Sequence, residues 1–186
     1  WASYKDAETA ATPLALMKQA VHGDANALSQ LPDTMSLFLG NNPGCIGEIS
    51  ALALLIGLVY MLWKKIISWH IPVSIIATVF VFSGLMHLAN PAAYASPFVH
   101  LFTGGLMLGA IFMATDYATS PVTKPGQLIF GLGCGLLTCF IRRFGSYPEG
   151  VCYSILIMNC TTWLLDKYIR PVIYGAPKKE KKEAAK

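Results

Sequence analysis

Thr12 and Pro13 mark the first place in this sequence where a side chain could take part in chemistry. Threonine is favoured as the cap of a helix and proline at its first position, so the pair predicts a short helix over residues 13–22, ended by Gly23. A phosphate ester on the Thr12 hydroxyl would lie where free backbone N–H groups and the helix dipole favour negative charge. These residues alone leave two interpretations open, an unmodified capping threonine and a phosphate-linked one.

Four ionisable side chains border the long apolar runs of the sequence, and charge near hydrocarbon is costly enough to make each a functional candidate. Glu48 and Asp116 stand at the ends of runs, where a charge that simply reaches water is the alternative. Arg142 and Glu149 flank a turn over residues 145–148. We expect these two either to pair with each other or to hold an anionic cofactor or a lipid phosphate.

The cysteines could suggest a metal centre, but their spacing does not favour one. They form no CxxC pair, and all except Cys45 lie within the apolar runs. The five are Cys45, Cys134, Cys139, Cys152 and Cys160. Small apolar packing residues are the simpler interpretation. We therefore expect no zinc or iron–sulfur cluster held by this chain alone.

The composition is that of a membrane protein. Hydrophobic residues make up 54% of the 186 positions and charged residues 13%, and the mean hydropathy is +0.51. A formal net charge of +4 could suggest nucleic acid, but five of the lysines fall within residues 178–186. This is a solvated basic tail beside a membrane, and no nucleic-acid partner is expected.

The apolar runs predict an all-α, polytopic membrane protein with about five transmembrane helices. Residues 1–45 are polar enough to form an extracytoplasmic segment, residues 46–170 hold the membrane bundle, and residues 171–186 form the basic cytoplasmic tail. A soluble helical bundle is disfavoured, because five apolar helices follow one another with brief connections. The predicted spans are residues 46–63, 71–88, 98–115, 126–141 and 150–166.

The basic residues predict the orientation in the membrane. If the spans alternate, Lys64, Lys65, Lys124 and Lys167 lie on one side with the tail, which is then cytoplasmic. The N-terminal segment with Thr12 would face outward. The short loops of the outer side hold only the arginines of residues 142–143, and these need a local role.

Two pairs of glycines have the spacing that lets helix backbones approach closely in lipid. Gly105 and Gly109 are four residues apart, as are Gly131 and Gly135. We expect all four to serve helix packing in a compact bundle.

Several motifs resemble one family of redox membrane proteins. The segment 6–12, with Asp6, Thr9, Ala11 and Thr12, is similar to the flavinylation motif of Rnf complexes and of the sodium-pumping NADH:quinone oxidoreductase. The segment 44–50 resembles the Gly-x-x-Gly-Glu-Thr-Ser signature of the RnfD proteins, except that Ile49 stands where the family usually has threonine. Further matches follow in the family's order at residues 113–116, 120–123, 131–135, 141–142, 145–150 and 156–159.

This resemblance implies an electron-transfer subunit that is not active alone. In the family, a flavin transferase joins FMN through its phosphate to the threonine that matches Thr12, while Asp6, Thr9 and Ala11 belong to the recognised motif. Glu48, Asp116, Arg142 and Glu149 are expected to help bind the cofactor. The family's complex oxidises reduced ferredoxin with NAD and moves Na⁺ or H⁺ across the cytoplasmic (inner) membrane.

The resemblance also implies partners and a missing part. The partners are the other Rnf-type subunits, the flavin transferase and membrane lipid, and the sodium-pump relative binds a noncovalent riboflavin as well. The family has two five-helix repeats, and this chain resembles the linker and the second repeat. Because it opens at Trp1 without an initiator methionine, we expect it to be processed, cut or part of a longer polypeptide.

Two other functions remain open at this stage. A channel or secondary transporter would also show repeated helices and buried polar groups. A structural subunit would keep the packing glycines and carry no flavin.

Overall fold

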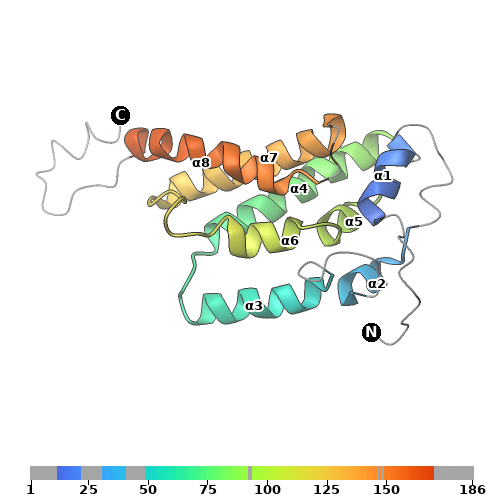
Figure 1. The fold of residues 1–186 in the computed structure, drawn as a ribbon, viewed down its shortest axis with the longest axis horizontal. Helices are drawn as coiled ribbons and strands as arrows, with labels where there is room; N and C mark the ends of the chain where they lie inside the picture. The colour runs from blue at the N-terminus through green and yellow to red at the C-terminus, as the bar shows by residue number, and fades with distance from the viewer. Residues whose placement is uncertain are drawn as a thin grey trace, which may run out of the picture.

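The computed structural model describes residues 12–21, 31–40, 49–91, 94–145, 147 and 149–169, and these residues form helices without any strand. The predicted all-α fold is thereby confirmed for the described part of the chain. Figure 1 shows a bundle of long helices with shorter ones at one end. The elements are α1 (Pro13–Val21), α2 (Thr34–Leu39), α3 (Ala51–Trp63), α4 (His70–Ala89), α5 (Pro97–Phe102), α6 (Leu106–Leu108), the π-helix η2 (Gly109–Met113), α7 (Lys124–Phe144) and α8 (Val151–Tyr168).

Each of the five apolar ranges contains helix, and the long helices alternate in direction (Figure 1). Helix α7 packs along both α4 and α8, while α3 contacts α2 and α6. As a result, the C-terminal ends of α4 and α7 lie at the same end of the bundle as α1, α2 and α5. Thr12, which directly precedes α1, therefore lies at the same end of the bundle as the C-terminal end of α7.

The contact between α4 and α7 depends on two glycines in α7. A Cβ atom added at Gly131 would lie 2.7 Å from the Cβ of Ser74, and one added at Gly135 would lie 2.7 Å from the Cβ of Thr78. Both distances are too short for real side chains, so the two backbones approach closely only because these positions are glycine. The predicted packing role of this pair is confirmed.

The predicted span over residues 98–115 is broken. Helix α5 ends at Phe102, the backbone turns through Gly104 with a φ of +71°, and α6 continues directly into η2. Gly109 packs against the side chain of Val151 in α8, as expected of a packing glycine, but Gly105 lies in the break and not on a helix face. The expected packing role is therefore confirmed for Gly109 and wrong for Gly105.

Two of the described helices, α4 with 20 residues and α7 with 21, are long and apolar enough to cross a membrane. Helix α3 has 13 residues, which at about 1.5 Å per residue gives roughly 20 Å. Large apolar side chains stay exposed along the bundle, among them Ile56 on α3, Leu85 on α4 and Leu156 on α8. A surface of this kind needs another apolar surface or lipid to cover it.

Candidate functional site

Thr12 caps α1 as the sequence predicts. Its Oγ1 accepts a hydrogen bond from the backbone N of Ala15 at 3.4 Å, and its carbonyl accepts from the same N at 2.8 Å and from Leu16 at 3.1 Å. Pro13 follows as the first residue of the helix. Thr12 itself is exposed, so its hydroxyl combines a fixed position at a helix N-terminus with access from solvent.

Helix α1 is fastened to the bundle in two ways. Leu14 and Met17 are buried in a small apolar cluster with Leu37 of α2 and Val99 of α5. The Nζ of Lys18 donates a hydrogen bond of 2.8 Å to a carbonyl at the end of α7, that of residue 145. A cation at a helix C-terminus also interacts favourably with the helix dipole. These contacts hold α1, and with it the Thr12 hydroxyl, at the end of the bundle where α7 finishes.

Arg142, in the last turn of α7, reaches across to the break in the third apolar range. Its two terminal nitrogens donate to the carbonyls of His100 at 2.8 Å and Thr103 at 3.1 Å, and the second also lies 3.4 Å from a carboxylate oxygen of Glu149. The Arg142 side chain is only 7% exposed. Such a buried guanidinium is stabilised because its terminal nitrogens meet acceptors and its charge meets a carboxylate.

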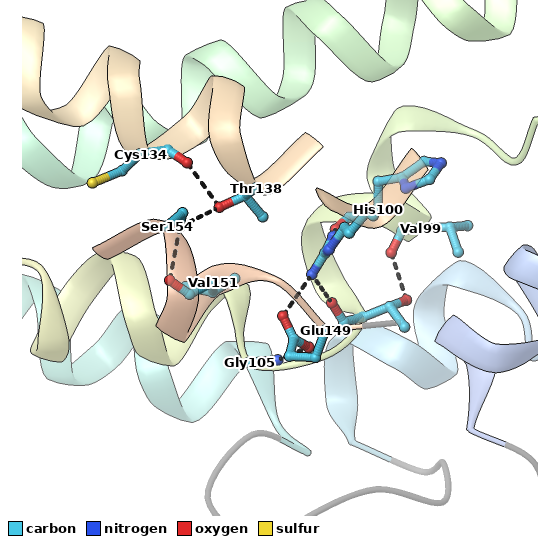
Figure 2. Close-up of polar contacts among 10 residues, drawn as sticks. Val99, His100, Gly105, Cys134, Thr138, Glu149, Val151 and Ser154 are labelled. Atoms are coloured by element: carbon cyan, nitrogen blue, oxygen red, sulfur yellow. Dashed lines mark hydrogen bonds and ion pairs between the residues drawn. The ribbon is translucent and has the colours of Figure 1, made fainter. Parts of the chain in front are cut away.

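Glu149 completes the same network from the other side of the break, as Figure 2 shows. Its second carboxylate oxygen accepts a hydrogen bond of 2.9 Å from the backbone N of Gly105. A side chain at Gly104 would overlap this carboxylate, which explains the glycine as much as the positive φ does. Arg142 and Glu149 therefore pair with each other, the first of the two roles predicted for them, and together they hold the broken backbone.

A second polar contact joins α7 and α8 nearby (Figure 2). The hydroxyls of Thr138 and Ser154 lie 2.8 Å apart, and both residues are buried. Each hydroxyl also lies within hydrogen-bond distance of a carbonyl, Thr138 of that of Cys134 and Ser154 of that of Val151. Because each hydroxyl has one proton, one of them donates to the other hydroxyl, and the second donates to its carbonyl. This contact satisfies each hydroxyl inside the bundle and needs no ligand to do so.

The structure brings together only some of the predicted site residues. Thr12, Arg142 and Glu149 lie at one end of the bundle. Asp116 is exposed in the loop before α7, where it accepts a hydrogen bond from the Thr119 hydroxyl at 3.3 Å. The length of α7, about 30 Å, separates that loop from Arg142. The remaining candidates lie outside the described residues: Asp6, Thr9, Ala11 and Glu48.

Sequence reasoning missed two contributors to this end of the bundle. Lys18 carries no motif and resembles a solvent-exposed charge on a short helix. The pair Gly104–Gly105 was a usable signal, because adjacent glycines commonly mark a break in a helix. The cysteines described in the structure show no shared site, since Cys134 and Cys139 are buried in α7 whereas the two in α8 are exposed.

Comparison with known proteins gives a consistent result. A model of the NQR2, RnfD, RnfE family matches residues 1–175. The D subunit of the Na⁺-translocating ferredoxin:NAD⁺ oxidoreductase complex of Acetobacterium woodii is 50% identical over 182 residues, covering 97% of this chain and 53% of the relative. The D subunit of the proton-translocating complex of Clostridium ljungdahlii is 44% identical, covering 94% and 53%. The D subunit of an ion-translocating oxidoreductase complex of Halorhodospira halophila is 38% identical, covering 91% and 48%.

The chain spans about half the length of the curated relatives it matches. The similarity nevertheless extends over nearly all of its own residues, including the N-terminal segment and the broken helix.

Proposed function

Because this chain belongs to the NQR2, RnfD, RnfE family of membrane proteins, we propose that it is the second half of a D-type subunit in an ion-translocating ferredoxin:NAD oxidoreductase. In this proposal Thr12 carries FMN through a phosphoester. The subunit takes part in electron transfer coupled to Na⁺ or H⁺ movement, together with the other subunits of the complex. It is not active in isolation.

The observation that carries the proposal is the position of the Thr12 hydroxyl. It is exposed, it stands at the first turn of a nine-residue helix, and that helix is docked on the bundle. A transferase can reach an exposed hydroxyl, and the N-terminus of α1 favours the negative charge of a phosphodiester. The residues at this site therefore fit a phosphate-linked flavin.

The chain's own residues would position the cofactor. Lys18 and the buried face of α1 fix where the attachment point lies relative to α7, and Arg142 with Glu149 fixes the backbone on which α1 rests. When bound, the flavin would supply the redox chemistry by taking up and releasing one or two electrons. A short, docked helix limits how far the attached ring can move, which favours transfer between fixed partners.

We further propose that all five apolar ranges cross the cytoplasmic membrane, with α1 outside and the C-terminus in the cytoplasm. Lys64 and Lys65 follow α3, Lys124 begins α7 and Lys167 ends α8, so all four lie at the end of the bundle away from α1. An excess of lysine on one side is typical of the cytoplasmic face.

The test uses the full-length subunit, produced together with its flavin transferase, as wild type, Thr12→Ala and Thr34→Ala. Thr34 is the matched control, because it begins the short helix α2 at the same end of the bundle but lies outside the motif. We expect a covalent fluorescent band in a denaturing gel for wild type and Thr34→Ala, and none for Thr12→Ala. The mass of the peptide containing residue 12 should carry the added FMN.

A fluorescent band that persists in Thr12→Ala would refute this attachment site. An unmodified wild-type peptide, obtained in the presence of the transferase, would leave a flavin-free channel or structural subunit as the better description.

A further inference from the structure

A pocket lies beneath α1, at the end of the bundle where α4 and α7 finish. Its volume is about 60 Å³, several times the roughly 10–15 Å³ that a single water needs. Apolar side chains form much of its wall, among them Leu14 and Met17 of α1 and Phe82 and Met86 of α4. The pocket can therefore hold a group larger than a water molecule, with an apolar part.

The charged side chains that line this pocket are all cationic. Lys18, Arg142 and Arg143 all line it, and no acidic side chain does so among the described residues. The carboxylate of Glu149 offsets the positive charge of Arg142 only, and Glu149 does not line the pocket. Charge complementarity thus points to an anionic ligand.

Arg143 is arranged to bind an anion. Its guanidinium carbon lies 5.6 Å from the ring centre of Tyr94 and 5.3 Å from that of Phe144, so the aromatic rings hold its faces. The structure gives its N–H groups no hydrogen-bond acceptor within the described part of the chain. A guanidinium held by its faces keeps its edge donors available for a planar or tetrahedral oxyanion.

Arg142 supplies a second, independent observation. Its side chain is 7% exposed, yet its Nε is buried without a hydrogen-bond partner among the described residues. A buried, charged donor left without an acceptor is costly, and in folded proteins it is normally satisfied by a ligand or a water. Arg142 lines the same pocket as Arg143, so one bound anion could serve both.

The surroundings identify the class of ligand. The stretch of α4 that lines the pocket with Phe82 and Met86 exposes Val81, Leu85 and Leu88, which in a membrane protein meet acyl chains. The arginines stand in the last turn of α7, where the helix ends and lipid headgroups begin. We propose that this pocket binds the phosphate of an anionic phospholipid, whose acyl chains lie along the apolar side chains of α4.

This binding gives the two arginines the local role that their position on the lysine-poor side requires. It also places a lipid directly against α1, so the lipid would contribute to holding that helix on the bundle. The proposal rests on the proposed membrane crossing of α4 and α7, and it stands whether or not Thr12 carries a flavin.

The test is native mass spectrometry of the full-length subunit within its complex, delipidated in detergent and titrated with dioleoylphosphatidylglycerol. Dioleoylphosphatidylcholine, with the same chains and no net charge, and inorganic phosphate are the comparison ligands. We expect one phosphatidylglycerol bound in clear preference to both. Arg143→Gln should weaken its binding about fivefold, the effect typical of one basic residue near a lipid surface.

Two matched variants make the result specific. Arg143→Lys keeps the charge but loses the stacked guanidinium edge, so it should recover only part of the affinity lost in Arg143→Gln. Lys124→Gln removes a cation at the far end of the bundle and should leave affinity unchanged. Equal binding of the two lipids, inorganic phosphate binding in place of the lipid, or an affinity unaltered in Arg143→Gln would each overturn the proposal.

Discussion

Replacing Glu149 by alanine should release the break between α5 and α6. The change removes the acceptor for the backbone N of Gly105, at 2.9 Å, and the carboxylate that lies 3.4 Å from Arg142. The Arg142 guanidinium is buried and cannot recover its lost counter-charge from water. Local opening of this segment should therefore become easier, even where the rest of the bundle stays folded.

The size of the effect follows from the exposure of the two partners. Removing one member of a fully buried ion pair costs about 3–5 kcal/mol, and losing one hydrogen bond costs about 0.5–1.5 kcal/mol. Glu149 is 34% exposed, and Arg142 keeps its bonds to two carbonyls, so the pair is partly screened. We expect a local cost of about 2 kcal/mol, which is roughly a 30-fold rise in the opening equilibrium.

Hydrogen exchange followed by mass spectrometry measures this opening in peptides that cover residues 100–109 of the full-length subunit. Glu149→Gln should show a smaller rise than Glu149→Ala, because an amide oxygen can still accept from the Gly105 N–H. Asp116→Ala is the control, since its carboxylate bonds only locally and lies at the other end of α7. A rise of less than about threefold in Glu149→Ala would mean that the carboxylate does not hold the break.

Two further predictions concern packing. Gly131→Ala should destabilise the protein by about 1–3 kcal/mol in thermal unfolding, because the new methyl group meets Ser74 and backbone of α4. Gly133→Ala is its matched control and should cost less, since the flexible side chain of Met158 can move aside; equal costs would show that the close backbone approach is unimportant. Lys18→Met should raise hydrogen exchange across α1 about fivefold by removing its bond to the end of α7, and unchanged exchange would show that apolar contacts alone dock the helix.

The long apolar helices could be predicted from sequence because their signal is local. Helices α4 and α7 begin and end within three residues of the predicted spans, and α1 ends one residue before its predicted end. In each case the signal lies within the element or directly beside it. It is the apolar run, the capping threonine, or the flanking glycine and proline. Thr12 could be placed at a helix start for the same reason.

The break in the third range could not be predicted with the same certainty, because the residues that stabilise it are distant in the chain. An apolar run over residues 98–115 looks continuous, and the backbone groups freed at Gly105 and Thr103 gain partners only from Arg142 and Glu149. The pairing of these two charges was one of two predicted roles. That the pair also binds the backbone of the broken helix could be seen only in the three-dimensional structure.

The distance in sequence between these backbone groups and their partners affects how the protein folds during synthesis. The partners of the His100 and Thr103 carbonyls and of the Gly105 amide lie 42, 39 and 44 residues further along the chain. At synthesis rates of roughly 5–20 residues per second, these backbone groups wait about 2–9 seconds for their partners. Unpaired backbone groups are costly in lipid, so under the proposed topology the third segment needs shelter in the insertion machinery or beside water during that time. The bundle thus closes only after α7 and Glu149, which lies between α7 and α8, have emerged from the ribosome.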